Sequence, residues 1–412
     1  MKAAISSKRR TQIGEAAGLP TTANKVKSQM EESHSSRDKS VLQVERRDYT
    51  QLAPTGRDRV QKLEGFDPVY TDIVDYIVRC THKIWDERDV GLIYSHYTHN
   101  CVVYGSLGSI QSREEVVKST IQQLASFPDR RGMANQVIWT GNDKDGFYTS
   151  HLVTSVGRHN QPGHLGPATG RSFATRIIAD CMVLENRIYR EWVIADNLGV
   201  FRQLGLDADM LARLQASSMF KRGIEEIDIG ENRRLVGQMP PEESPDLELA
   251  GSELEQQTLS WMHEVYNKRM FGRIEQVYAS NAMFHGTQMR EQYGRAAILQ
   301  NTLGLVASLP DCVLMPQHIC SVESEEGGAK VAVRWVLAGH HQGHGALRGL
   351  GATSGQYIQI TGMTHFHYRN GRIVDEWVVY DEYAAMVQKY LGQFHAGTAE
   401  PILDGDFDMP ID

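Results

Sequence analysis

One segment of this chain occurs twice, about 180 residues apart, and this repeat constrains the fold more than any other feature. The two versions read EWVIADNLGVFRQLG at residues 191–205 and EWVVYDEYAAMVQKYLG at residues 376–392. A period of this length is far longer than one unit of a solenoid, so it indicates two copies of a whole domain. In each copy a carboxylate, Asp196 or Asp381, stands at the end of an apolar strand.

Composition narrows the class of protein. The 412 residues suffice for two or three domains with hydrophobic cores, and the net charge of −8 argues against a nucleic-acid partner. No apolar run approaches the ~20 residues that a membrane span needs, and the N-terminal residues lack the apolar stretch of a signal peptide. Five cysteines without a CxxC pair predict reduced thiols, and with them a cytoplasmic location.

The chain divides into five predicted segments. Its first part is rich in Lys, Arg, Ser and Glu with few aromatic residues, so it is expected to be disordered or to form an extended arm. An acidic stretch with prolines separates the two copies and predicts a linker. The predicted segments are an arm at 1–62, a first domain at 63–206, a linker at 207–249, a second domain at 250–394 and a tail at 395–412.

Each copy begins with helical patterns and ends with strands. Apolar residues recur at helical spacing between Tyr70 and Trp85, and Ser112 with Glu115 has the spacing of a capping box. Alternating apolar segments follow, and Asn370-Gly371 predicts a tight hairpin turn in the second copy. Helices followed by antiparallel strands indicate an α+β fold in which a curved sheet wraps two or three helices and encloses a cone-shaped pocket.

The repeated motifs resemble those of a known family. They are TGR (169–171), ENRIYREW (185–192), Asp196 and RQLG (202–205); the second copy changes TGR to TSGQ (353–356) but keeps GRIVDEW (371–377) and Asp381. In these motifs the chain resembles two tandem SnoaL-like domains, the polyketide-cyclase branch of the NTF2-like superfamily. The resemblance implies two cones packed as an intramolecular pseudo-dimer, a small-molecule substrate and no cofactor or metal, and leaves further homo-oligomerisation open.

Asp196 is the first candidate for chemistry. On its strand Trp192, Ile194 and Asp196 share one face, so the carboxylate is expected either to have a partner or to have its pKa raised by desolvation. A helical pattern follows, and the alternative role is therefore a helix N-cap. The resemblance implies an acid/base role for the Asp at this position, and Asp381 is interpreted in the same way.

Several cationic side chains are expected to assist. His151 lies on an alternating strand, with Arg334 at the position matched to it in the second copy. His164 and His344 stand in glycine-rich loops, at the surface or over a pocket mouth. His365 and His367 lie on the strand before Asp381, where an imidazole could share a proton with the carboxylate. Arg171 could bind an anionic or carbonyl oxygen, or form a surface salt bridge.

Aromatic residues recur at matching sites in the two copies and are candidates for pocket walls or for core. The set consists of Trp192, Tyr97, Tyr104, Trp377 and Tyr278. The sequence thus predicts an enzyme with a pocket Asp as general acid/base that acts on a small, largely apolar carbonyl or hydroxyl compound as a cyclase, isomerase, lyase or hydrolase. The alternative is a non-catalytic small-molecule binding or scaffolding protein. The groups around the two acids differ, which predicts two similar cones with unequal sites.

Overall fold

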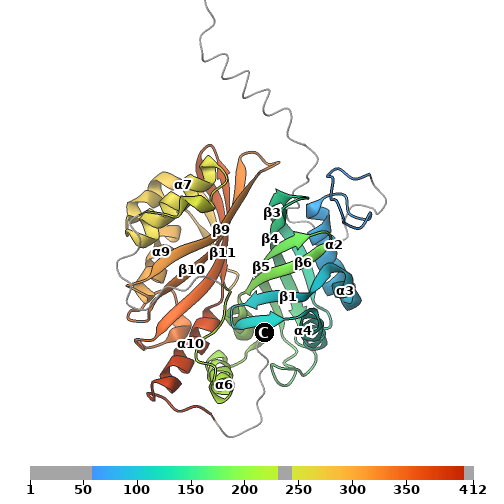
Figure 1. Ribbon diagram of the computed structural model, residues 1–412. Coiled ribbons are helices and arrows are strands. Elements are labelled where there is room, and N and C mark those ends of the chain that lie inside the picture. The colour runs from blue at the N-terminus through green and yellow to red at the C-terminus, as the bar shows by residue number, and fades with distance from the viewer. Residues whose placement is uncertain (1–57, 231–243, 403–412) are drawn as a thin grey trace, which may run out of the picture. The chain divides into compact units, whose positions relative to one another are not determined.

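The computed structural model describes residues 58–230 and 244–402 (Figure 1). Most of the expected arm, part of the expected linker and most of the expected tail lie outside these residues. Where the linker was expected, the described part includes helix α6 (Ala208–Lys221), whose Ala212, Ala216 and Met219 are buried and which packs against α10 (Glu382–His395). Its apolar face and its Asp207 N-cap make this stretch a helix rather than a connector.

The first domain follows the predicted order of helices and then strands. Its elements are α2 (Ile73–Trp85), α3 (Ile93–His96), β1 (Tyr97–Gly105), β2 (Gly108–Gln111), α4 (Arg113–Ser126), β3 (Arg131–Asn142), β4 (Gly146–Arg158), β5 (Ser172–Leu184), β6 (Arg187–Ala195) and α5 (Asn197–Leu204).

The second domain repeats this order. Its elements are α7 (Glu253–Met262), α8 (Ile274–Val277), β7 (Tyr278–His285), β8 (Glu291–Tyr293), α9 (Arg295–Ser308), β9 (Val313–Glu323), β10 (Ala329–His340), β11 (Tyr357–Arg369), β12 (Arg372–Tyr380) and α10. A π-helical turn (His263–Asn267) continues α7.

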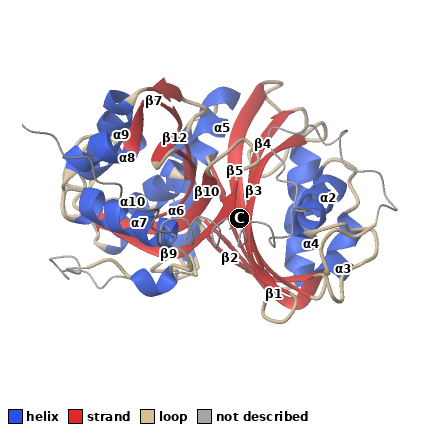
Figure 2. Ribbon diagram, turned by 90° about the horizontal axis from the view of Figure 1, so that it is seen from above, coloured by secondary structure: helices blue, strands red, loops and turns tan. Residues whose placement is uncertain are grey.

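Each domain has one six-stranded sheet with the same topology. The strand orders are β2-β1-β6-β5-β4-β3 and β8-β7-β12-β11-β10-β9. The α+β class is confirmed, but the sheets are mixed rather than purely antiparallel, because β1 pairs in parallel with β6 and β7 with β12. Helices α2 and α4 cover one face of the first sheet, and α7 and α9 cover one face of the second (Figure 2).

Local sequence signals explain where the elements begin and turn. The Ser112 side chain accepts the N–H of Glu115 at the start of α4, as the capping-box spacing predicts, and the Asp72 side chain accepts the N–H of Asp75 at the start of α2. Asn370 and Gly371 connect β11 to β12 with φ of 50° and 72°. Two successive positive φ values match the tight hairpin turn that this pair predicts.

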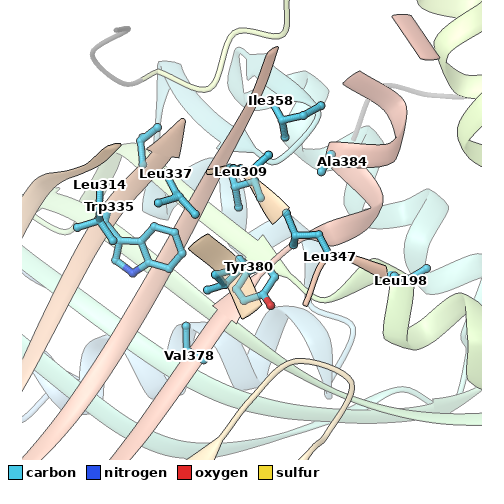
Figure 3. Packing of buried hydrophobic residues seen from close by; sticks show 14 of the residues in the cluster. Leu198, Leu309, Leu314, Trp335, Leu337, Leu347, Ile358, Val378, Tyr380 and Ala384 are labelled. Atoms are coloured by element: carbon cyan, nitrogen blue, oxygen red, sulfur yellow. The ribbon is translucent and has the colours of Figure 1, made fainter. Parts of the chain in front are cut away.

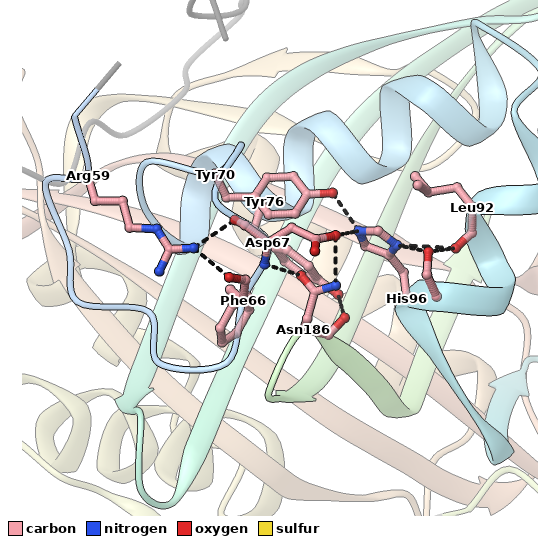
Figure 4. A network of polar contacts seen from close by, with 9 residues as sticks. Arg59, Phe66, Asp67, Tyr70, Tyr76, Leu92, His96 and Asn186 are labelled. Atoms are coloured by element: carbon pink, nitrogen blue, oxygen red, sulfur yellow. Dashed lines mark hydrogen bonds and ion pairs between the residues drawn. The ribbon is translucent and has the colours of Figure 1, made fainter. Parts of the chain in front are cut away.

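The chain enters the first domain through a hydrogen-bonded segment (Figure 4). The Arg59 guanidinium donates to the carbonyls of Leu63 (2.7 Å) and Phe66 (2.5 Å). The Asp67 N–H donates to the side chain of Asn186, which lies in the turn between β5 and β6, and the Asn186 amide donates back to Asp67. The buried Tyr76 hydroxyl donates to the carbonyl of Asn186. This network fastens the entry segment to the end of the sheet.

The two sheets contact each other through the faces that α2, α4, α7 and α9 leave uncovered. A cluster of apolar side chains joins Leu152, Ile178, Trp192 and Ile194 of the first domain to Met363 and Val379 of the second. A polar group lies beside this cluster, where Arg334 donates to Asp180 (3.3 Å) and to the Tyr148 hydroxyl (2.5 Å). The Arg334 guanidinium also lies 3.6 Å from the centre of the Trp192 ring. The predicted pseudo-dimer is therefore confirmed.

Candidate active site

A cavity of about 320 Å³ lies inside the first domain, between its sheet and helices α2 and α4. Most of the wall is apolar, from side chains such as Ile77, Ile84, Val116, Val153 and Phe173. The polar residues include Glu191, His151 and Tyr97 from the sheet. A small, largely apolar compound fits a space of this size and lining.

Strand β6 shows which side chains face the cavity. Glu191, Val193 and Ala195 line it, whereas Trp192 and Ile194 pack against the second domain on the opposite face. The alternation follows from the two-residue period of a strand. Trp192, a candidate for a pocket wall or for core, is buried in the interface between the domains, where its ring stacks on Tyr104 (centroids 5.5 Å apart).

Two carboxylates line the cavity, that of Asp86 at the end of α2 and that of Glu191 on the sheet. Glu191 Oε2 accepts a hydrogen bond from the Tyr97 hydroxyl (2.9 Å), and its Oε1 accepts one from the Cys181 thiol (3.6 Å). Burial raises the pKa of Glu191, while the bonds from Tyr97 and Cys181 lower it. A carboxyl group with a raised pKa is a stronger base than an ordinary carboxylate, and after it takes up a proton it can act as an acid.

His151 lies on the same face of the sheet. It pairs with Ala179 on β5, which pairs with Val193 on β6, so His151 and Glu191 occupy adjacent rows two strands apart. Burial lowers the pKa of His151 to about 3, which leaves the imidazole neutral at physiological pH. Its buried Nε2 has no hydrogen-bond partner within residues 58–230 and 244–402. A neutral imidazole in this position can donate to an oxygen of a bound molecule.

His164 and Tyr97, two further predicted site residues, also line the cavity. Arg171 does not, because it is exposed and its guanidinium packs over the backbone of Gly205 at the end of α5. His344 is exposed in its loop.

Asp196 and Asp381 do not line the cavity, although the first residue of the following helix, Asn197, does. Asp196 caps α5: its Oδ1 accepts the N–H of Gly199 (3.0 Å), and its Oδ2 accepts the N–H of Gln288 from the second domain. The capping interpretation of Asp196 is therefore confirmed. The carboxylate is buried at the interface between the domains rather than in a pocket, because Asp196 shares the face of Trp192 and Ile194.

Asp381 has the equivalent arrangement from the other side. It caps α10 by accepting the N–H of Tyr383 (3.0 Å), and its Oδ2 accepts from the Ser106 hydroxyl and the Asn197 amide, both at 2.8 Å. Burial raises the pKa of Asp381 to about 7, against the lowering effect of the bonds from Asn197 and Ser106.

The histidines expected beside Asp381 lie elsewhere. His365 bonds to the Ser150 hydroxyl (2.8 Å) and the Gln136 side chain (3.0 Å) of the first domain, so it belongs to the interface. Burial lowers its pKa to about 3. His367 bonds to the Gly327 carbonyl (3.0 Å) and lies 3.8 Å from Asp375. His365 is in register with Trp377 and His367 with Asp375, four and six residues before Asp381, so both rings lie further along the sheet than that carboxylate.

The predicted match between His151 and Arg334 is wrong. In the first sheet His151 is in register with Ala179 and Val193, and the same row of the second sheet contains Val333, Thr364 and Val378. Arg334 is one residue further along β10, so it faces the interface rather than the interior of its domain. The second domain thus has valine where the first has the cavity histidine.

Larger side chains fill the interior of the second domain. Three residues that line the first cavity are small, and the residues at the equivalent positions of the second sheet are large. Val153, Cys181 and Ala195 correspond to Trp335, Phe366 and Tyr380, respectively. Trp335 and Tyr380 pack together in the core (Figure 3). The remaining space is about 30 Å³, roughly the volume of one water molecule. The prediction of two unequal sites fits this difference.

The remaining aromatic candidates are structural. Tyr278 donates to Glu376 (2.8 Å) inside the second domain, and Trp377 stacks on His285 with ring centroids 4.6 Å apart. Burial raises the pKa of Glu376 to about 7, although the bond from Tyr278 lowers it. The Tyr278–Glu376 pair repeats the Tyr97–Glu191 pair of the first domain.

Glu191 is the site residue that the sequence did not single out. The signal was present, because the Glu-Trp pair recurs at 376–377 and Tyr97 and Tyr278 occupy matching positions. In the described ranges no group of three or more His, Cys, Asp or Glu side chains is arranged to hold a metal ion. Among the helices of these ranges, none combines the length and apolar character needed to cross a membrane.

Comparison with known proteins identifies the family. The model of the SnoaL-like polyketide cyclase family matches residues 76–204 and again residues 256–389. No protein with a curated description matches the chain.

Three solved structures are each similar to about a third of the chain. A SnoaL-like polyketide cyclase from Jannaschia sp. CCS1 is 15% identical over 36% of this chain and 97% of its own, with a TM-score of 0.30. The hydroxylase AclR from Streptomyces galilaeus is 15% identical over 32% of this chain and 92% of its own, with a TM-score of 0.28. The polyketide cyclase IdmH from Streptomyces antibioticus is 23% identical over 31% of this chain and 91% of its own, with a TM-score of 0.26. With two family matches that together span more than half of its length, this chain belongs to the SnoaL-like polyketide cyclase family.

Proposed function

We propose that this chain is an enzyme that transfers a proton next to the carbonyl group of a small, largely apolar compound in the cavity of its first domain. The observation that carries this proposal is Glu191, a buried carboxyl group in a mostly apolar cavity with its pKa raised by burial. Membership of a family of polyketide cyclases supports the same class of reaction. The chemistry needs no cofactor, since the carboxylate supplies the base and then the acid.

Glu191 would take a proton from the carbon beside the substrate carbonyl. The electron pair of that C–H bond would move to the carbonyl oxygen and form an enolate, whose charge the neutral imidazole of His151 would stabilise by donating a hydrogen bond. In a cyclisation the enolate carbon would then attack a second carbonyl carbon of the same substrate. The protonated Glu191 would return its proton to the oxygen of that second carbonyl.

The Tyr97 hydroxyl would orient Glu191 within the cavity. Its hydrogen bond holds one carboxylate oxygen, and by favouring the charged form it keeps the pKa of Glu191 lower than burial alone would make it. The second domain, whose interior is filled, would act as structural support rather than as a second active site.

One observation favours a second candidate, a non-catalytic protein that binds small molecules. The Tyr278–Glu376 pair keeps the same hydrogen bond beside a space of only about 30 Å³, so such a pair can also serve folding alone. Under this alternative the cavity would hold a ligand, and Glu191 would remain a fixed acceptor for Tyr97 and Cys181.

Deuterium exchange of phenylacetone in deuterated water distinguishes the two candidates. The wild-type chain is expected to exchange the methylene protons faster than buffer, and Glu191→Gln is expected to lower that enhancement roughly 100-fold or more. Glu376→Gln is the matched control, because it makes the same change at the paired motif of the filled domain and should leave the rate unaltered. Equal rates for wild type and Glu191→Gln would support the binding protein instead.

A further inference from the structure

Helix α10 of the second domain begins beside the cavity of the first domain. Its residue Tyr383 is one of the cavity-lining residues and is 2% exposed. The Tyr383 ring meets Phe201 of α5 edge to face, with centroids 4.8 Å apart, and Phe201 lines the cavity as well. The wall of the first cavity therefore contains an aromatic side chain from the other copy of the repeat.

The Tyr383 hydroxyl is buried and has no hydrogen-bond partner within the described ranges. Buried hydroxyl groups almost always have a partner, because leaving one unpaired costs the free energy of its lost hydration. A cavity-lining hydroxyl can recover that free energy by donating to an acceptor on a bound molecule. The ketone oxygen of a carbonyl compound is such an acceptor.

Asp381 fixes the start of α10 against the cavity wall. Its Oδ1 accepts the backbone N–H of Tyr383, and its Oδ2 accepts from the side chains of Ser106 and Asn197. Ser106 and Asn197 also line the cavity, so one carboxylate of the second domain holds three residues of this wall. Asp381 itself does not line the cavity, and its effect on a ligand would be exerted through these partners.

The equivalent residue of the first domain, Leu198, makes a different kind of contact with the second domain. Leu198 holds, after Asp196 on α5, the position that Tyr383 holds after Asp381 on α10. Leu198 is buried in the hydrophobic cluster that includes the core of the second domain (Figure 3), and its side chain approaches Gly349 of that domain. The repeat thus places a hydroxyl group at the open cavity and an aliphatic side chain at the filled core.

We infer that the ligand site of the first domain is completed by the second, with Tyr383 as a ligand-binding residue that donates a hydrogen bond to a carbonyl oxygen and Asp381 as the residue that positions it. This inference rests on the proposed use of the cavity for a carbonyl compound. It also gives the filled domain a role in recognition that a purely structural support would not have.

Binding of benzophenone and of diphenylmethane tests the inference, because the two have similar shapes and only benzophenone has a carbonyl group. Titration of the full chain should show that Tyr383→Phe weakens benzophenone about 5-fold to 10-fold and leaves diphenylmethane unchanged. Tyr390→Phe is the matched control on the same helix, since the Tyr390 hydroxyl donates to Asp209 at the surface. Equal benzophenone affinity in wild type and Tyr383→Phe, or no binding by the wild type, would overturn the inference.

Asp381→Asn tests the positioning role. The Asn side chain still caps the helix but no longer accepts from both Ser106 and Asn197. The variant should weaken benzophenone without weakening diphenylmethane, and adding Tyr383→Phe should cause little further loss. Equal losses for both ligands would mean a purely structural role and overturn this part. The exchange rate of Glu191→Gln is a separate measurement, so the proposed function can fail while the binding result stands.

Discussion

Trp335 occupies in the second sheet the register position that Val153 occupies in the first. Val153 pairs with Ile177, which pairs with Ala195, and Trp335 pairs with Gly362, which pairs with Tyr380. The Trp335 indole packs directly over the backbone of Gly362, where a Cβ atom would collide with it. The same position of one fold therefore contributes to a cavity in one copy and to solid core in the other.

Placing the larger side chain in the first domain should close its cavity. Val153→Trp is expected to weaken benzophenone binding at least 10-fold while the chain stays folded, because the indole enters space that is empty in the wild type. Titration of the folded variant measures the effect. Val156→Trp, on the same strand but of opposite parity, is the control and should retain binding. Unchanged affinity in Val153→Trp would place the ligand elsewhere.

The reverse substitution should destabilise the second domain. Trp335→Val removes a side chain that is 3% exposed and whose indole N–H donates to Thr364 (2.9 Å). The expected cost is about 3 kcal/mol or more in the free energy of unfolding, from lost burial and the space left behind. Urea denaturation measures it. Val153→Ala should cost roughly 1 kcal/mol, because Val153 already borders empty space, and a loss in Trp335→Val no larger than this would contradict the packing described here.

Removal of the Tyr97 hydroxyl should shift the pH dependence of proton exchange. Its hydrogen bond lowers the pKa of Glu191, so Tyr97→Phe raises that pKa further. Exchange that needs the carboxylate form increases as pH rises through this pKa, so the profile should move to higher pH. The measurement is the pH profile of phenylacetone exchange. Tyr278→Phe, the matched change in the filled domain, should leave the profile in place, and a Tyr97→Phe profile identical to wild type would argue against Glu191 as the base.

Glu376 should make the chain less stable as pH rises. Its pKa increases from an ordinary 4.5 to about 7 on folding, so the folded state binds the proton more tightly than the unfolded state. The resulting stabilisation is complete below about pH 4.5 and is lost as pH rises to about 7; it amounts to roughly 3 kcal/mol at 1.36 kcal/mol per unit. Urea denaturation of Glu376→Gln should show a smaller loss of stability between pH 5 and pH 8 than wild type. Parallel curves for the two proteins would mean that Glu376 does not titrate in this way.

Much of the fold could be predicted from the sequence because its signals are local. The helix at 73–85, the capping box at Ser112 and the turn at Asn370-Gly371 each follow from neighbouring residues. The parallel pairing of β1 with β6 could not be predicted in this way, since it joins strands more than 80 residues apart. Helix α6 was missed because it follows the repeated unit and packs against α10, far away in sequence.

The candidate site was predicted only in part, for a geometric reason. Strand parity correctly grouped Trp192, Ile194 and Asp196, but parity does not reveal which face of a sheet borders a cavity and which borders another domain. The face of β6 that contains Asp196 is buried in the interface of the pseudo-dimer, and Glu191 lies on the opposite face, which borders the cavity. Likewise, the sequence comparison aligned β4 with β10 one residue out of register, so it assigned Arg334 to the cavity face although Arg334 lies on the interface face.

The central claim is that proton transfer depends on Glu191 in the cavity and not on the Asp that ends the same strand. The most direct test compares Glu191→Gln with Asp196→Asn in the exchange of phenylacetone protons at pH 7. Asn keeps the helix cap, so Asp196→Asn should retain nearly the wild-type rate, whereas Glu191→Gln should lose roughly 100-fold or more. The opposite result, with Asp196→Asn inactive and Glu191→Gln active, would contradict the claim and return the acid/base role to Asp196.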